Sequence, residues 1–223
     1  HVGGTSLFRR FLRHFWLEAH AGFTPFMLID SPPGFGKSSL AWNFGRLLDH
    51  DFDFSRYLYD HERFMTALFR NPPMSVHAFD DATATRVLWG RDSTRGGQKE
   101  AVANILGHAR NRKQILIIIS QSGYQLDRIL REDIRAVWVN LLSRDPISGE
   151  KTAELYYPKQ VLLWSRHGGY LLGKPTIYRL AGRMTIPPTP ENVMKQYEKV
   201  RAEGFGLSPE TRVRISVIPD QRE

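Results

Sequence analysis

The chain of 223 residues contains no cysteine, so disulfide bonds and thiolate-bound metals are excluded. A lack of cysteine is typical of proteins from a reducing cytoplasm or from a hot habitat. We therefore expect a cytoplasmic location, which for a viral or plasmid-encoded protein is the cytoplasm of the host. Long hydrophobic runs are also missing. The longest, residues 115–119, has the length of a strand and falls far short of the roughly 18 residues that a membrane span needs, so we expect no membrane insertion.

Acidic residues are too few to balance the basic ones. The 31 Lys and Arg residues exceed the 23 Asp and Glu residues, which gives a formal net charge of +8. Such an excess favours a polyanionic partner, most often nucleic acid, and DNA is our expectation. A solvated basic face is the alternative, and an ATP site also uses positive charge. The hydrophobic content of 41% argues against disorder and for a globular domain.

The most informative motif is FMLIDSPPGFGKSSL at residues 26–40. An apolar segment typical of a strand precedes a glycine-containing turn, and a helical segment runs from Lys37 to residue 48. Backbone N–H groups of such a turn and helix N-terminus bind phosphate, and the helix dipole favours the anion. The alternative is a Gly/Pro turn before an ordinary amphipathic helix. The nucleotide-binding residues that we expect are Ser31, Pro32, Pro33, Gly34, Phe35, Gly36, Lys37, Ser38 and Ser39.

Each part of this motif has an expected role. Lys37 would reach the β- and γ-phosphates of ATP, and the Ser38 hydroxyl would ligate Mg²⁺. The general pattern is G-x-x-x-x-G-K-[ST], but Ser31 stands at the position of the first glycine. A small residue can occupy that position if its backbone φ stays negative.

A second motif, VHAFDD at residues 76–81, places carboxylates after an apolar strand. We expect this strand beside the P-loop strand, where Asp80 would hold Mg²⁺ through its water shell. Asp81 would orient or polarise the attacking water, with Asp92 and Glu100 as alternatives for the base. A strand that simply ends in a polar turn is the competing interpretation.

A third motif is the apolar strand at residues 115–120, which Gln121 follows. The amide of a glutamine at the tip of a central strand can reach a γ-phosphate or the attacking water. An ordinary loop glutamine is the alternative.

Strands and helices alternate along the first two thirds of the chain, which predicts a mainly parallel sheet covered by helices on both faces. We expect an ATPase core with an N-terminal helix at 1–145, a β-rich extension of the same domain at 146–186, and a C-terminal helix and tail at 187–223. The predicted helices are residues 7–19, 37–48, 62–69, 100–109, 124–131 and 193–202, and the predicted strands are 26–29, 55–59, 75–79, 115–120, 136–142, 154–157 and 161–164.

Aromatic and basic residues interleave in the extension, as in surfaces that stack bases or grip phosphates. The candidates for nucleic-acid contact are Arg166, Lys174 and Arg179. The alternative is a packed β extension with solvated arginines. In that case we expect the nucleic-acid-binding surface on the first helix. The basic residues there are Arg9, Arg10 and Arg13.

The segments SPPGFGKS, VHAFDD and HARNRKQILIIISQSGYQLDRILRED, within residues 26–139, resemble the FtsK/HerA group of additional-strand P-loop ATPases. That group includes virus genome-packaging motors and conjugation ATPases. The resemblance implies a RecA-like core, ATP and Mg²⁺, assembly of identical subunits into a ring, and movement of DNA. By position, Gln121 takes the sensor role at the end of the strand.

A ring that hydrolyses ATP between subunits needs an arginine from the neighbour to neutralise charge in the transition state. Our first candidates are Arg110 and Arg112, followed by Arg128 and Arg131, although a surface or salt-bridge role is the alternative for each. The sequence thus predicts an ATP-hydrolysing motor that moves or packages nucleic acid. The alternatives are a nucleotide-dependent DNA-binding adaptor or assembly switch, and a small-molecule kinase, for which no acceptor or lid motif is visible.

Overall fold

The computed structural model describes residues 3–21, 25–59, 61–80, 96–121, 136–165 and 169–204. The chain divides into two compact units, residues 1–189 and residues 190–223. The first unit contains the sheet and the P-loop. The described part of the second unit is one helix, α6 (Glu191–Gly204).

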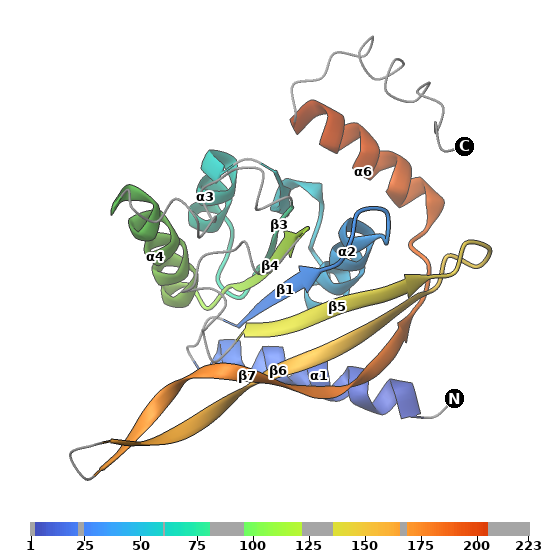
Figure 1. The fold of residues 1–223 in the computed structure, drawn as a ribbon. Helices are drawn as coiled ribbons and strands as arrows, with labels where there is room; N and C mark the ends of the chain where they lie inside the picture. Colours follow the sequence, from blue (N-terminus) through green and yellow to red (C-terminus); the bar gives the residue numbers. More distant parts are fainter. Residues whose placement is uncertain are drawn as a thin grey trace, which may run out of the picture. The chain divides into compact units, whose positions relative to one another are not determined.

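Seven strands among the described residues form one sheet in the order β2-β3-β4-β1-β5-β6-β7 (Figure 1). The first five strands in this order are parallel to one another. Strand β6 runs antiparallel to β5, and β7 runs antiparallel to β6. The expected α/β fold class is confirmed: a mainly parallel sheet is flanked by helices and continues into a C-terminal β-hairpin. The strands are β1 (Phe26–Asp30), β2 (Tyr57–Leu58), β3 (Val76–Phe79), β4 (Ile115–Ser120), β5 (Ala136–Arg144), β6 (Lys151–Ser165) and β7 (Gly169–Ile186).

Helices cover both faces of the parallel part of the sheet. Because side chains alternate along a strand, Phe26 and Leu28 of β1 point to one face and Met27 and Ile29 to the other. The first pair packs in a cluster with residues of α3 and α4, and α2 contacts β1, β3 and β4 in the opposite layer. These helices are α2 (Lys37–Leu48), α3 (His61–Arg70) and α4 (Gly96–Asn111).

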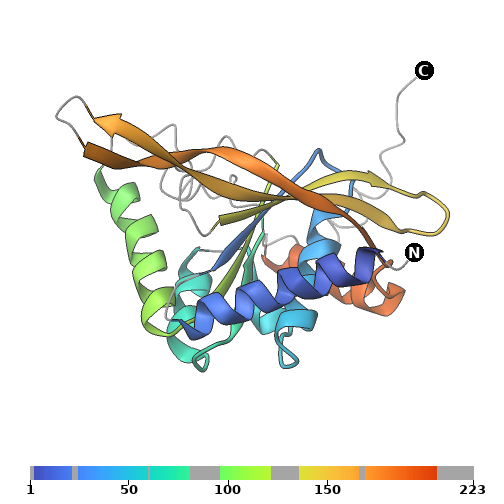
Figure 2. The same cartoon turned by 90° about the horizontal axis from the view of Figure 1, so that it is seen from below.

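The N-terminal helix α1 (Gly3–His20) lies in the same layer as α2 and also contacts β7 (Figure 2). Its buried Phe11 packs edge-on against Phe44 of α2, with ring centroids 5.5 Å apart. Arg10 and Arg13 lie on its exposed side, as the amphipathic spacing predicts. No helix in the described part of the chain combines the length and the apolar character needed to cross a membrane.

Three predicted strands differ from the structure in their extent, and one predicted helix lies outside the described residues. The strand predicted at 55–59 is reduced to β2, because a 3₁₀ turn, η1 (Phe54–Arg56), precedes it. The residues predicted as two strands, 154–157 and 161–164, are strand residues, but they belong to one continuous strand, β6, instead of two. A proline such as Pro158 commonly ends a strand, but here Pro158 lies within β6 and pairs with Tyr178 of β7. The register shifts nearby, between Lys159 and Val161, and prolines within strands are found at such irregularities. The predicted helix at 124–131 lies outside the described residues.

The far part of the β6–β7 hairpin extends beyond the sheet. Strand β5 pairs with β6 only over Lys151–Tyr156, so residues 157–165 of β6 pair with β7 alone. We call this two-stranded segment, residues 157–165 and 169–179, the ribbon. Figures 1 and 2 show it as a twisted pair of strands that projects beyond the rest of the sheet.

The packing of α2 depends on a glycine, which gives a first prediction. A Cβ atom placed on Gly45 would lie 2.3 Å from the ring of buried Phe52, whereas one placed on Gly107 of α4 would meet nothing within 4 Å. Gly45→Ala should therefore lower the free energy of unfolding by about 1–3 kcal/mol through overpacking. Gly107→Ala should raise it by about 0.5–1 kcal/mol, because alanine favours the helix. Urea denaturation measures both, and equal effects of the two changes would contradict this packing.

Candidate nucleotide-binding site

The turn between β1 and α2 has the backbone of a phosphate-binding loop. Gly34 and Gly36 have φ of 86° and 88°, in the left-handed region that favours glycine. Ser31, at the usual first-glycine position, is not among the described non-glycine residues with positive φ. The expectation that a small residue fits there with negative φ is confirmed. Ser31 is buried, and its hydroxyl donates a hydrogen bond to the Pro32 carbonyl at 3.1 Å.

Lys37 opens α2 and its side chain folds back over the turn. Its Nζ donates hydrogen bonds to the carbonyl oxygens of Ser31 at 2.6 Å and of Pro32 at 3.1 Å. The ammonium group therefore lies over the loop whose N–H groups and helix dipole favour an anion. A phosphate bound there would interact with the Lys37 ammonium, which would then give up its hydrogen bonds to the two carbonyl oxygens.

Asp80 lies next to the start of α2, and Tyr57 holds it there. Asp80 directly follows β3 and is 5% exposed. The hydroxyl of Tyr57, which is fully buried in β2, lies 2.7 Å from Oδ2 of Asp80 and 3.2 Å from the carbonyl oxygen of Ser38. Its single proton serves one of these acceptors at a time. The Tyr57 hydroxyl thus lies between the Asp80 carboxylate and the backbone carbonyl of Ser38. The sequence marks Tyr57 only as an aromatic in a short strand.

The strand of Asp80 is not the neighbour of the P-loop strand, so that expectation is wrong. Strand β4 lies between them, with Leu116 paired to both Phe26 of β1 and His77 of β3. Residues 115–119 of β4 are apolar and buried, which suits a central strand covered on both faces. Asp80 still meets the start of α2, because this helix crosses over β4 and also contacts β3.

Gln121 stands at the same edge of the sheet. It directly follows β4 and is exposed. Ser120 pairs with Asp30, and Gln121 and Ser31 each directly follow one of these two paired strand ends. The position agrees with a sensor at the phosphate end of the sheet, and the role stays a prediction. Asp81 and Asp92 lie outside the described residues, as does the side chain of Glu100.

The arginine candidates occupy the opposite edge. Arg110 and Arg112 are at the C-terminal end of α4, which leads into the amino end of β4. Arg110 is exposed, whereas Nη2 of Arg112 donates a hydrogen bond to the Asn71 carbonyl at 2.6 Å. Neither lies at the carboxyl edge of the strands that holds its own P-loop. Arg128 and Arg131 lie outside the described residues.

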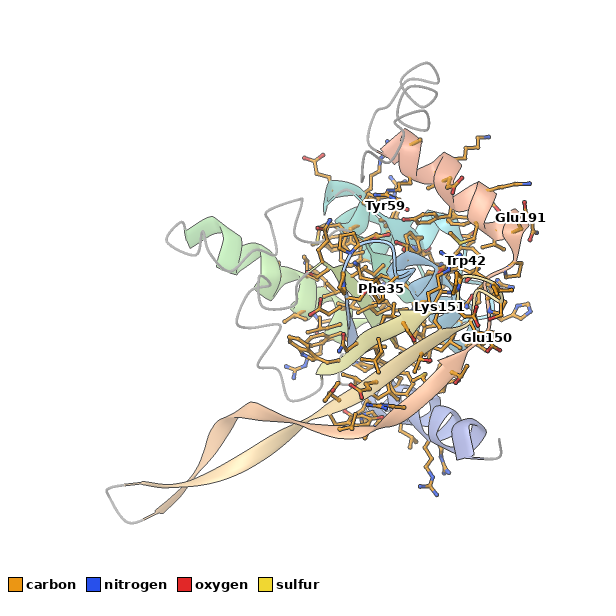
Figure 3. All side chains as sticks on the ribbon, turned by 45° about the vertical axis from the view of Figure 1, so that its right-hand side comes forward. Phe35, Trp42, Tyr59, Glu150, Lys151 and Glu191 are labelled. Carbon is orange, nitrogen blue, oxygen red and sulfur yellow. The ribbon has the colours of Figure 1, made fainter. Side chains whose placement is uncertain are left out.

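A lysine that sequence reasoning missed lies against the P-loop. A Cβ atom placed on Gly36 would be 2.8 Å from Cε of Lys151, which is only 2% exposed. Figure 3 labels Lys151 close to Phe35 of the turn. Burial lowers the pKa of Lys151 from its ordinary value, and the charge of Arg144 lowers it further. No local motif indicates this contact, because Lys151 lies 115 positions after Gly36 in the sequence.

The other end of the hairpin is fastened to the P-loop helix. After β7, the Thr189 hydroxyl lies 3.1 Å from both the Ser39 carbonyl and Oδ1 of Asn43. Nδ2 of Asn43 donates to the Pro187 carbonyl at 3.3 Å. Both ends of the β6–β7 hairpin therefore contact the segment that begins with the P-loop.

The nucleic-acid candidates are only partly placed. Lys174 and Arg179 belong to β7 within the ribbon, although their side chains lie outside the described residues, as does Arg166. Among the described residues, no group of three His, Cys, Asp or Glu side chains could hold a metal ion. A Mg²⁺ ion at Ser38 and Asp80 would therefore take its remaining ligands from phosphate and water, which is its usual preference.

The comparisons with known proteins concern the fold. No family model and no curated protein matches the chain. The chain is similar to a protein in the Escherichia coli MS115-1 HORMA:CdnC:Trip13 complex, with a TM-score of 0.43, 12% identity and coverage of 61% of this chain and 62% of that one. It is also similar to the N-terminal domain of zonular occludens toxin from Neisseria meningitidis, with a TM-score of 0.42, 13% identity and coverage of 78% and 98%.

A further solved structure with the same type of similarity is the genome packaging NTPase B204 from Sulfolobus turreted icosahedral virus 2, in complex with ATP-gammaS. Its TM-score is 0.40, with 13% identity and coverage of 69% of this chain and 98% of that one. At such identities these similarities concern the arrangement of the fold and carry no information on activity.

The contact through Tyr57 gives a second prediction. Tyr57→Phe keeps the buried ring but removes the hydroxyl that positions Asp80 beside Ser38. The affinity for ATPγS should fall roughly 3- to 10-fold in the presence of Mg²⁺, the value of one lost hydrogen bond, and stay unchanged with EDTA. Isothermal titration calorimetry measures both conditions.

The matched control is Tyr156→Phe, which removes a tyrosine hydroxyl bonded to another carboxylate, that of Glu154. This variant should bind ATPγS as the unaltered chain does. If Tyr57→Phe bound with unchanged affinity in Mg²⁺, its hydroxyl would have no part in organising the metal site.

Proposed function

We propose that the chain is an ATPase that moves or packages nucleic acid and works as a ring of identical subunits. The observation that carries the proposal is the P-loop with its surroundings. A turn with two left-handed glycines leads into a helix, Lys37 lies over the turn, and Tyr57 holds Asp80 beside Ser38. This combination suits the binding of a nucleoside triphosphate with a divalent cation.

The proposed reaction is attack of water on the γ-phosphate of ATP, which releases ADP and phosphate. N–H groups of the turn and the start of α2 bind the phosphates, and Lys37 neutralises their charge. Ser38 and Asp80 would hold Mg²⁺, which would supply further positive charge at the phosphates. Asp81 and Gln121 orient the attacking water, with Asp92 and Glu100 as alternatives for the base.

The order of the strands supports assignment to the FtsK/HerA group. The three motifs of the sequence resemble that group, and β4 lies between the P-loop strand and the strand of Asp80. This arrangement fits an additional-strand P-loop ATPase. We therefore propose ring assembly and nucleic-acid movement, the properties that the resemblance implies.

Assembly would bring an arginine of one subunit to the ATP site of the next. The two first candidates differ in their availability, because Arg110 is exposed while Arg112 is engaged with the Asn71 carbonyl. We therefore prefer Arg110 for this role. Its place at the edge away from its own P-loop suits action on a neighbouring subunit.

A DNA-binding switch is the second candidate function, and a specific observation favours it. Both ends of the β6–β7 hairpin contact the P-loop segment. Nucleotide binding at the P-loop could therefore change the conformation of the ribbon without hydrolysis. A switch would change its DNA affinity with nucleotide but would not travel along DNA. A translocation assay on triplex-labelled DNA, with displacement of the third strand as readout, separates the two. A small-molecule kinase has no comparable support.

Loss of Lys37 gives the third prediction. Lys37→Ala should lower ATP turnover by about 10²–10³-fold, because the developing charge on the phosphates loses its nearest cation. Release of phosphate, measured with and without DNA, reports the effect. The control is Lys113→Ala, an exposed lysine before the amino end of β4. Turnover by Lys37→Ala at the rate of the unaltered chain would remove the active-site assignment.

A mixing experiment extends this test to the ring. Arg110→Ala subunits should also turn over slowly, yet a mixture with Lys37→Ala subunits should regain activity. Some interfaces in the mixture then combine an intact Lys37 with an intact Arg110. No recovery, together with a monomeric mass in the presence of ATP and DNA, would contradict assembly through Arg110.

The basic ribbon gives the fourth prediction. A motor that follows a DNA backbone grips phosphates, and each contact contributes a slope of about −0.9 in log affinity against log salt. Replacing Arg166, Lys174 and Arg179 together by Ala should flatten this slope by up to about 3 units and leave ATP binding unchanged. Fluorescence anisotropy of labelled DNA over a salt series measures the slope. An unchanged slope would point to Arg9, Arg10 and Arg13 instead.

A further inference from the structure

Lys151, the first residue of β6, is buried against the P-loop without an opposite charge. Its side chain is 2% exposed, and a Cβ atom on Gly36 would lie 2.8 Å from its Cε and 3.5 Å from its Cδ. In the described part of the chain, no hydrogen bond or ion pair engages its ammonium group. Lysines are rarely buried unless they are paired, so this position calls for an anion.

The groups around Lys151 add positive rather than negative charge. Arg144 stands directly opposite it on β5, and like charges at such positions repel. Lys37, the first residue of α2, directly follows Gly36, which Lys151 contacts. The carboxylate of the preceding residue, Glu150, is not in any salt bridge found among the described residues. The described residues thus supply no anion to this positively charged cluster, and a bound phosphate would supply one.

We propose that Lys151 binds the α- and β-phosphates of a nucleoside di- or triphosphate held by the P-loop. The inference deepens the proposed function and rests on it. Backbone N–H groups of a P-loop cradle the α- and β-phosphates, while the loop lysine reaches the β- and γ-phosphates. Lys151 touches Gly36 of this cradle, so its ammonium complements Lys37 on the inner part of the phosphate chain.

This contact places a nucleotide-binding charge on the strand that continues into the ribbon. Lys151 begins β6, and residue 157 of the same strand begins the unsupported part of the hairpin. A phosphate that neutralises Lys151 also relieves its repulsion with Arg144. Nucleotide binding therefore acts directly on the base of the hairpin.

The fifth prediction tests this role with Lys151→Met, which keeps the apolar stem and removes the charge. The melting temperature of the nucleotide-free protein should rise by about 2–4 °C, because a buried unpaired charge is lost. The affinity for both ATPγS and ADP should fall about 10- to 100-fold, as expected for a charged hydrogen bond to phosphate. Calorimetric titration and thermal denaturation measure these two effects.

Opposite signs of the two effects distinguish a ligand-binding lysine from a structural one. A structural lysine would lower the melting temperature and leave the affinity unchanged, and either result would overturn the proposal. Loss confined to ATPγS would overturn the assignment to the α- and β-phosphates. The control Lys113→Met, at an exposed position, should change neither quantity.

A second variant guards against a failure to fold. Lys151→Gln retains a polar end and should show the same loss of affinity. If neither Lys151→Met nor Lys151→Gln folded, Lys151 would have a structural role and the proposal would be overturned. The unaltered chain separates this inference from the proposed function. If it binds ATPγS while Lys151→Met binds equally well, only the inference falls; if it binds no nucleotide, both fall.

Discussion

Burial of the central strands on both faces is the constraint on which the rest of the structure depends. Strands β1 and β4 lie in the middle of a parallel sheet between two helical layers, so their side chains are almost entirely apolar. Polar groups can therefore appear only where these strands end. At the carboxyl edge this rule places the P-loop turn after β1, Asp80 after β3 and Gln121 after β4.

The polar groups of that edge are joined by few but specific contacts. Tyr57 lies within hydrogen-bonding distance of both Asp80 and the Ser38 carbonyl, although β2 is the outermost strand of the parallel part. Lys37 is held over its own turn by two carbonyls. The position of Asp80 in the proposed metal site thus depends on a buried tyrosine hydroxyl from another strand.

The C-terminal hairpin is tied to this edge rather than attached to the core as an independent extension. Lys151 at its start touches Gly36, and Thr189 after its end lies beside Ser39 and Asn43 of the P-loop helix. The ribbon, in contrast, pairs with nothing else in the described sheet. The hairpin therefore has an anchored base beside the proposed nucleotide and a free end that carries the candidate DNA-binding residues.

The sequence by itself determined the alternation of strands and helices, the P-loop turn and the position of Asp80 and Gln121 at strand ends, because apolar runs and glycine turns are local signals. Only the tertiary structure decided the strand order, which puts β4 beside the P-loop strand, and the continuity of β6 through Pro158. It also brought Tyr57 to Asp80 and Lys151 to Gly36. Such contacts join residues far apart in the chain, and they depend on how elements pack, which no local pattern encodes.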